Sequence, residues 1–278
     1  MSRHNHRLSY RKRREKAVAR GKPAVRRRSD VQEEESLLFW KRLFAGVFLF
    51  PVAVISVFTI VEMLFRATQE DHFWRTDEFL FFTVGCLMWA GVYWAGWRPM
   101  RSYVFAHEFT HLLVAKAFGG KIYDWKVSAE GGYVETNKSN IWITLGPYLL
   151  PFYTLVVLAL FGVVGRFVDM EAWQPLALGK WVLHYRWAWV MYGSVGFTWC
   201  YHLTFTAHTI HAEQGDLTRN GEFFSLMLIF IVNLGLIALL FVAASPLVDL
   251  EDVWRTWWGV AQNSWILLKS LFGPTSQW

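Results

Sequence analysis

Two histidines and a glutamate in the middle of the chain form a motif that can bind and use a metal ion. The sequence there reads His107-Glu108-Phe109-Thr110-His111, an HExxH pattern. On a helix, positions four apart share a face, so the two imidazoles can converge on one Zn²⁺, and Glu108 lies beside them as general base for a zinc-bound water. Random placement of 9 His and 14 Glu would give the pattern only roughly 0.015 times. The motif therefore predicts a catalytic zinc site rather than a pair of core histidines.

The helix that carries this motif belongs to a very apolar chain. Hydrophobic residues make up 54% of the sequence, and charged residues only 18%, against roughly a quarter in a typical soluble domain. Five uncharged runs of 19 to 27 residues are each long enough to cross a bilayer as a helix. They lie between Arg42 and Glu62, Glu78 and Arg98, Lys138 and Arg166, Arg186 and Glu213, and Glu222 and Asp249. Together with a zinc helix over residues 102–118, they predict an all-α polytopic membrane protein of about six transmembrane helices.

Charge and tryptophan content divide the chain into three parts. Residues 1–36 hold 12 Lys or Arg against 5 Asp or Glu, which predicts a flexible, basic cytoplasmic tail that orients the first span and contacts anionic lipid. Residues 37–248 form the predicted membrane domain. Residues 249–278 repeat Trp at helical spacing, which predicts an amphipathic helix that lies in the membrane interface or packs on the bundle. Since no basic face exists outside the tail, a nucleic-acid partner is not expected.

A β-hairpin is predicted directly after the zinc helix. Residues 121–127 and 131–136 alternate in polarity around a Gly-Gly turn, a pattern typical of two antiparallel strands. Three other residues of reactive type lie in the apolar runs. Cys86 and Cys200 have neither disulfide nor metal-ligand spacing, so we expect both to be core residues, and we expect His202 to be a hydrogen-bonded core histidine.

Residues 106–120, around the HExxH motif, resemble the zinc helix of the site-2 protease-like family of intramembrane zinc metalloproteases. The resemblance continues through the hairpin to Gly146-Pro147-Tyr148 and Pro151, which open the next apolar run, and covers about residues 100–245. It implies one catalytic Zn²⁺, a membrane-anchored protein substrate and a multi-pass protein of a bacterial-type inner membrane. It also implies that a membrane-dipping hairpin holds the substrate as an extended strand, here along Gly132, Tyr133, Val134 and Glu135.

The resemblance further implies a third zinc ligand, an aspartate from a later helix. Asp216 matches best, with His208 and His211 as rival ligands or as residues that support a ligand without binding the metal, and with His184 as a distant alternative. The sequence departs from the family in two respects. Thr110 replaces the glycine often found before the second histidine, and the Asn-Pro-x-x-Asp-Gly form of the aspartate motif is absent.

If successive spans simply cross the membrane in alternating directions, Asp216 and His107 come to lie near opposite sides of it, so Asp216 could not bind the same metal ion. If residues 102–118 cross fully, the span that ends before Asp216 finishes on the opposite side from His107. Either the zinc helix and hairpin return to the side from which they came, or an apolar segment is re-entrant, or the third ligand is His184. The first alternative agrees best with a membrane-dipping hairpin, because non-helical backbone is tolerated at depth when it is buried in protein.

The leading hypothesis for function is an intramembrane zinc endopeptidase that hydrolyses peptide bonds in membrane-anchored proteins with a zinc-activated water. The alternative is a catalytically silent, metal-binding membrane scaffold or regulator of the same fold. A di-iron membrane hydroxylase is less expected, because only six histidines remain beyond His4, His6 and His72 and they form no HxxHH cluster. The lipid bilayer is an expected partner, and the sequence leaves the oligomeric state open.

Overall fold

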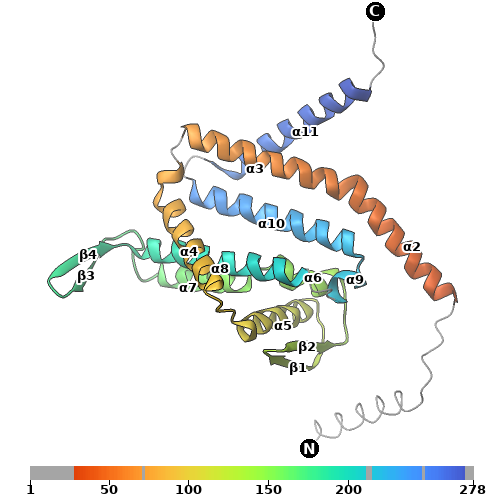
Figure 1. Cartoon of the computed structure of the whole chain (residues 1–278), viewed down its shortest axis with the longest axis horizontal. Coiled ribbons are helices and arrows are strands. Elements are labelled where there is room, and N and C mark those ends of the chain that lie inside the picture. Colours follow the sequence, from red (N-terminus) through yellow and green to blue (C-terminus); the bar gives the residue numbers. More distant parts are fainter. Residues whose placement is uncertain (1–27, 71–72, 211–214, 246–247, 273–278) are drawn as a thin grey trace, which may run out of the picture. The chain divides into compact units, whose positions relative to one another are not determined.

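The computed structural model describes residues 28–70, 73–210, 215–245 and 248–272, and these residues are mostly helical, with two small antiparallel hairpins (Figure 1). The chain divides into two compact units, Met1–Lys41 and Arg42–Trp278. Residues 1–27 of the predicted basic tail lie outside the described residues. Helix α2 (Arg28–Phe44) begins within the tail, so residues 28–36 are helical.

The elements that follow α2 alternate long helices with short hairpins. A π-helical turn η1 (Ala45–Leu49) continues α2 into α3 (Phe50–Glu70), and a short 3₁₀ turn η2 (Phe73–Arg75) precedes α4 (Asp77–Trp94). Around the motif lie α5 (Met100–Ala117), β1 (Ile122–Ser128), β2 (Gly131–Thr136), α6 (Ile141–Leu149) and α7 (Phe152–Val164). The rest comprises β3 (Gln174–Leu178), β4 (Trp181–Tyr185), α8 (Trp187–Ile210), α9 (Gly215–Arg219), α10 (Glu222–Ala244) and α11 (Leu250–Phe272).

Two of the described helices are long and apolar enough to cross a membrane: the continuous helix Glu35–Gln69 and Glu222–Ala244. A third span results if α6 and α7 count as one, although they are bent by 71°. Pro151 causes this break, because proline has no N–H to donate and the residue before it favours an extended backbone, as Leu150 shows. The expected six spans are not supported by length and composition, since Trp, Tyr, Thr and His in α8 and the polar motif in α5 lower the mean hydropathy of these helices.

Helices α4 and α8 approach each other so closely that their backbones touch. A Cβ added to Gly85 would collide with the carbonyl oxygen of Gly193, and one added to Gly196 would collide with that of Phe82. Small residues at such positions are typical of helix pairs in membranes, where close van der Waals contact drives association. Glycine at these sites thus lets α8 lie directly on α4, which fixes the helix that ends near the metal centre.

Aromatic residues and both cysteines occupy the remainder of this interface. Trp89 of α4 packs against Tyr201 and Phe205 of α8, and all three are buried. Cys86 and Cys200 are free, partly buried thiols on the two facing helices, and Cys86 Sγ lies 3.3 Å from the Gly196 carbonyl oxygen. This agrees with the expectation that both are core residues.

The hairpin after α5 has the predicted strands but a different turn. Strands β1 and β2 pair antiparallel from Ile122–Thr136 to Ser128–Gly131, so Ala129 and Glu130 form the turn. The predicted Gly-Gly turn is wrong, because Gly131 and Gly132 instead open β2. The hairpin packs against α5 (Figure 1), which places β2 beside the HExxH motif.

Helix α11 packs one side of its first half against α3. Trp257 Nε1 donates a hydrogen bond to Ser56 Oγ at 3.2 Å, while Trp254, Trp258 and Trp265 are exposed. One of the two sequence-based interpretations is confirmed, because one face of α11 packs on the bundle. The location of the exposed Trp-rich face in the membrane interface stays a prediction.

Candidate metal centre

Helix α5 carries His107, Glu108 and His111 within about one helical turn. A glycine ends the helix, which lets the hairpin return along it. Gly119 has φ +70°, its N–H donates to the Lys116 carbonyl, and the Gly120 N–H donates to the Ala115 carbonyl at 2.7 Å. This is the Schellman arrangement, which favours glycine in the left-handed position. It turns the chain into β1, and the hairpin then lies on the motif.

Three side chains that can bind a metal converge at the centre: His107 and His111 of α5 and Asp216 of α9. Their donor atoms all lie within 4.8 Å of one another. The two Nε2 atoms are 3.2 Å apart, and Asp216 Oδ2 lies 3.6 Å from His107 Nε2 and 3.3 Å from His111 Nε2. Ligands about 2.0–2.1 Å from a tetrahedral zinc ion are about 3.3 Å apart, so this spacing is compatible with three ligands around one metal ion of that size.

A backbone carbonyl fixes the tautomer of His111. Its Nδ1 lies 2.6 Å from the Ile143 carbonyl oxygen on α6, which can only accept, so Nδ1 carries the proton. In the neutral imidazole the Nε2 lone pair then faces the Asp216 carboxylate, and two acceptors oppose each other. A cation between them relieves this repulsion, as in metal sites where the second ring nitrogen of a histidine ligand donates to a carbonyl.

Tyr103 is the hydrogen-bond partner of His107 Nδ1, as the Ile143 carbonyl is of His111 Nδ1. Its hydroxyl lies 3.4 Å from His107 Nδ1 and 2.6 Å from Thr209 Oγ1 on α8. In the tautomer that leaves Nε2 free for a metal, Nδ1 donates to Tyr103, and Tyr103 in turn donates to Thr209. Tyr148 of α6 packs its ring edge-on against the His107 ring at 5.3 Å. These contacts hold the imidazole in place from three helices.

Asp216 is held in position by the packing of the residue that follows it. Leu217 is buried in a cluster with Leu145, Tyr148, Leu149 and Ile229, and its carbonyl accepts a hydrogen bond from Ser225 Oγ. Burial opposes charge on the Asp216 carboxyl, but in the metal-free protein imidazoles that carry a proton on Nε2 outweigh this effect, so the pKa of Asp216 is lowered. The carboxyl is therefore ionised, the form that binds metals.

Glu108 is buried beneath the hairpin. It is only 8% exposed, and a Cβ added to Gly132 would lie 2.6 Å from Glu108 Cγ and 3.0 Å from Val104 Cγ1. Only a residue without a side chain lets β2 pass this close to α5. Glycine at position 132 thus brings the strand backbone directly over the predicted general base.

The other hairpin residues named from the sequence follow Gly132 along β2. Tyr133 is half exposed and donates its hydroxyl hydrogen to Asp124 Oδ2 of β1 at 3.0 Å. Val134 pairs with Trp125, and Glu135 pairs with Asp124. Among the described residues, each strand of this sheet has one neighbour only, so its two outer edges are unpaired by any described strand.

The rival ligands that the structure describes, His208 and His184, do not join the three donors. His208 is exposed on α8, and His211 lies outside the described residues. His184 is exposed on β4, where it pairs with Pro175. His202 lines a cavity of about 20 Å³ beside His107, and its buried Nε2 has no hydrogen-bond partner among the described residues. The space suffices for about one water molecule.

The structure shows what Thr110 does in place of the family's glycine. It also shows two hydrogen-bond partners of the histidines, Tyr103 and the Ile143 carbonyl, that were not predicted from the sequence. Thr110 donates its hydroxyl hydrogen to the Ala106 carbonyl at 2.7 Å, so it adds no free hydroxyl to the centre. Tyr103 lies four residues before His107, a spacing that places both on one helix face and could have identified it. The Ile143 carbonyl has no sequence signal, because every residue carries one.

Comparisons with known proteins identify no relative: no protein-family model matches, and neither a curated protein nor a solved structure gives a significant match. The resemblance to site-2 proteases therefore rests on the motif over residues 106–120, the hairpin and the position of Asp216. What the structure establishes for this region is a set of three side chains that could hold a metal ion.

Proposed function

We propose that this protein is an intramembrane zinc metalloendopeptidase similar to site-2 proteases, with a membrane-anchored protein as substrate. The observation that carries the proposal is the spacing of His107 Nε2, His111 Nε2 and Asp216 Oδ2, which matches that of three ligands around one zinc ion. Two imidazoles, one carboxylate and an open position are the donor set of a catalytic rather than a structural zinc site, because structural sites use four protein ligands.

Each residue of the centre has a separate role in the proposed peptide hydrolysis. Zn²⁺ held at this centre would polarise the substrate carbonyl and acidify water. Glu108 accepts a proton from the attacking water and delivers it to the leaving amine, the two tasks of a general base and general acid. Its burial beneath β2 excludes bulk water from the same place. Tyr103 and the Ile143 carbonyl keep both imidazoles oriented through their Nδ1 atoms.

The hairpin supplies a means of binding an extended substrate. A peptide bond within a helix is shielded by intrahelical hydrogen bonds, so a membrane-anchored segment must unwind before cleavage. Residues Gly132–Glu135 run past Glu108, and an outer edge of the sheet can pair with the unwound segment by β-addition. The substrate carbonyl would then lie close to both the metal ligands and the general base.

The apolar helices support a membrane location for this chemistry. Glu35–Gln69 and α10 are long enough to cross, and α6 with α7 resembles a broken span or re-entrant segment. We propose that α4, α5 and α8 complete a multi-pass protein of about six spans in a bacterial-type cell membrane. The basic residues before the first span support a cytoplasmic amino terminus.

The test separates metal binding from catalysis. Purified Glu108→Gln should retain zinc and lose about 10²–10⁴-fold in cleavage of single-span substrates, because the amide cannot take up a proton. Glu222→Gln removes the same charge at an exposed position of α10 and should change neither quantity. His107→Ala, His111→Ala and Asp216→Ala should each lower the zinc content measured by elemental analysis.

Undiminished cleavage by Glu108→Gln would refute the mechanism. A wild-type protein with zinc but without activity on the substrate panel would favour the alternative of a silent metal-binding scaffold. Iron in place of zinc would revive the hydroxylase hypothesis.

A further inference from the structure

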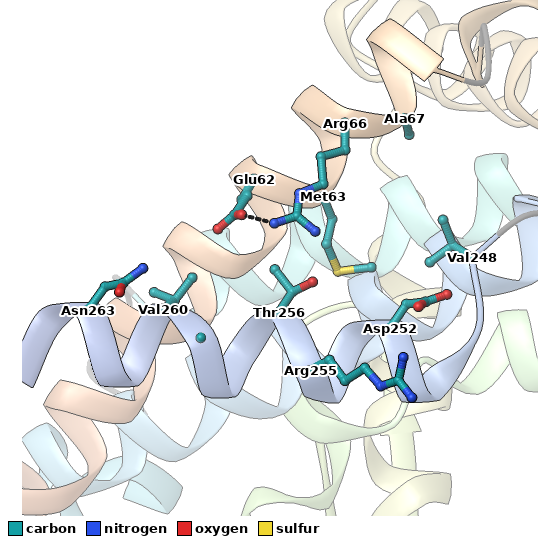
Figure 2. Close-up of a pocket in the computed structure, with 11 residues that line it drawn as sticks. Glu62, Met63, Arg66, Ala67, Val248, Asp252, Arg255, Thr256, Val260 and Asn263 are labelled. Carbon is teal, nitrogen blue, oxygen red and sulfur yellow. Dashed lines mark hydrogen bonds and ion pairs between the residues drawn. The ribbon is translucent and has the colours of Figure 1, made fainter.

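A second candidate site lies away from the metal centre, where α11 crosses α3. The two helices enclose a pocket of about 500 Å³, a volume within the range of small-ligand sites (Figure 2). Its lining combines apolar side chains with charged and polar ones. The charged residues that line it are Glu62 and Arg66 from α3 and Asp252 and Arg255 from α11.

The pocket carries two charges of each sign. Arg66 forms an ion pair with Glu62, and Arg255 forms one with Glu251 at 2.6 Å; both pairs lie between exposed residues four apart. Exposed pairs of this kind contribute little to stability, so the guanidinium groups can exchange these partners for a ligand at small cost. Two cations and two carboxylates around one space complement a ligand that is itself zwitterionic.

Backbone capping holds one of the carboxylates at the start of α11. Asp252 Oδ2 accepts a hydrogen bond from the Asp249 N–H at 3.1 Å, and Asp249 Oδ1 accepts one from the Asp252 N–H at 2.9 Å. Thr256 and Asn263 add polar groups along the same side of the helix (Figure 2). The polar surface is thus partly preorganised.

The location points to a lipid rather than a soluble ligand. Glu62 is the first charged residue after the uncharged run that begins beyond Arg42, so the pocket lies at the end of the apolar part of Glu35–Gln69. Phospholipid head groups occupy this level of a bilayer. Trp254 and Trp258 are exposed on α11, and tryptophan is favoured where acyl chains meet head groups.

We propose that the pocket binds the head group of a phospholipid that carries a phosphate and a primary ammonium, as phosphatidylethanolamine does. Arg66 and Arg255 would bind the phosphate, since guanidinium groups recognise phosphate oxygens through paired N–H donors. Glu62 and Asp252 would accept hydrogen bonds from the ammonium. A trimethylated head group cannot donate these bonds, and an anionic head group without an amine leaves both carboxylates unpaired. The site is independent of the metal centre and of peptide cleavage.

Lipid retention by the full-length protein tests the proposal. The protein is exchanged into mixtures of phosphatidylethanolamine, phosphatidylcholine and phosphatidylglycerol with identical acyl chains, and bound lipid is measured by native mass spectrometry. We expect the ethanolamine lipid to be enriched about tenfold, the scale of one charge-assisted hydrogen bond. The double variant Arg66→Gln, Arg255→Gln should lose this enrichment. The matched control Arg75→Gln, Arg166→Gln, at exposed positions outside the pocket, should keep it.

A second variant keeps the proposal testable if the first does not fold. Glu62→Gln with Asp252→Asn retains both guanidinium groups, so preference should move from the ethanolamine lipid toward phosphatidylglycerol. Equal retention of the three lipids by the wild type, or enrichment that survives the arginine changes, would overturn the proposal. Displacement of bound lipid by an equal concentration of soluble phosphoethanolamine would overturn the assignment to a lipid.

Discussion

Hairpin β1–β2 packs against α5 with Gly132 over the side chain of Glu108, whereas hairpin β3–β4 extends away from the helices (Figure 1). The second hairpin has the more regular register and a continuous apolar face, formed by the pairs Leu176–Leu183 and Leu178–Trp181. All four of these side chains are about half exposed or more. Regular strands and apolar cross-strand pairs therefore do not mark the hairpin that takes part in a site.

The two hairpins differ in whether another element packs against them. Gly119 ends α5 in a left-handed turn that sends β1 back along the helix, and Gly132 removes the side chain that would keep β2 away from it. In β3–β4, Gly179 has φ +61° at the turn, and nothing approaches its missing Cβ. Glycine thus serves close approach in the first hairpin and turn geometry alone in the second.

The largest effect that this comparison predicts follows from adding a side chain at position 132. Gly132→Val would place Cβ 2.6 Å from Glu108 Cγ and from the Lys126 carbonyl oxygen, so either the strand or the Glu108 side chain must move. A displacement of about 1 Å can cost about 10²-fold in rate, and we expect this loss in kcat with zinc content unchanged. Gly179→Val, the control in the other hairpin, should leave cleavage unchanged and cost about 1–2 kcal/mol in unfolding free energy. Wild-type cleavage by Gly132→Val would contradict the role of close approach.

A smaller effect is expected from removing one strand N–H. Val134→Pro deletes a donor from β2, which weakens either its ladder with β1 or its edge for the substrate. We expect kcat/KM for a single-span substrate to fall roughly tenfold, because β-addition depends on main-chain hydrogen bonds. Ala177→Pro makes the equivalent change in β3 and should leave kcat/KM unaffected. Equal losses in both variants would show that the two hairpins are not functionally distinct.

The smallest expected effect concerns the histidine of the second hairpin. His184→Ala should leave zinc content and cleavage unchanged, since His184 is exposed on β4 and lies outside the group of three donors. Zinc content is measured by elemental analysis, and the His111→Ala variant, measured in parallel, shows how large the loss of zinc is when a ligand is removed. Depletion of zinc in His184→Ala would mean that β3–β4 reaches the metal centre, and the comparison would fail.

Local patterns predicted most of the parts from which the candidate site is built. The HExxH spacing puts two imidazoles on one helix face, and α5 has them there; the alternation over residues 121–136 predicted strands, and β1 and β2 form them. The turn was misplaced by two residues, because Ala129 and Glu130 can form a two-residue turn without the glycines that usually mark one. Length and composition support two or three of the expected six spans, since uncharged runs rich in Trp, Tyr and Thr are less apolar than their lack of charge suggests.

The sequence alone determined the chemistry available to this protein: two histidines and a glutamate at helical spacing, a hairpin after them and apolar helices around them. These follow from interactions between residues close together in the chain, which the amino-acid pattern specifies directly. Only the tertiary structure decided which carboxylate completes the group, since Asp216 lies more than a hundred residues from His107 and reaches it through the packing of Leu217. It likewise decided that Ile143 sets the His111 tautomer and that β2, rather than β4, passes over Glu108.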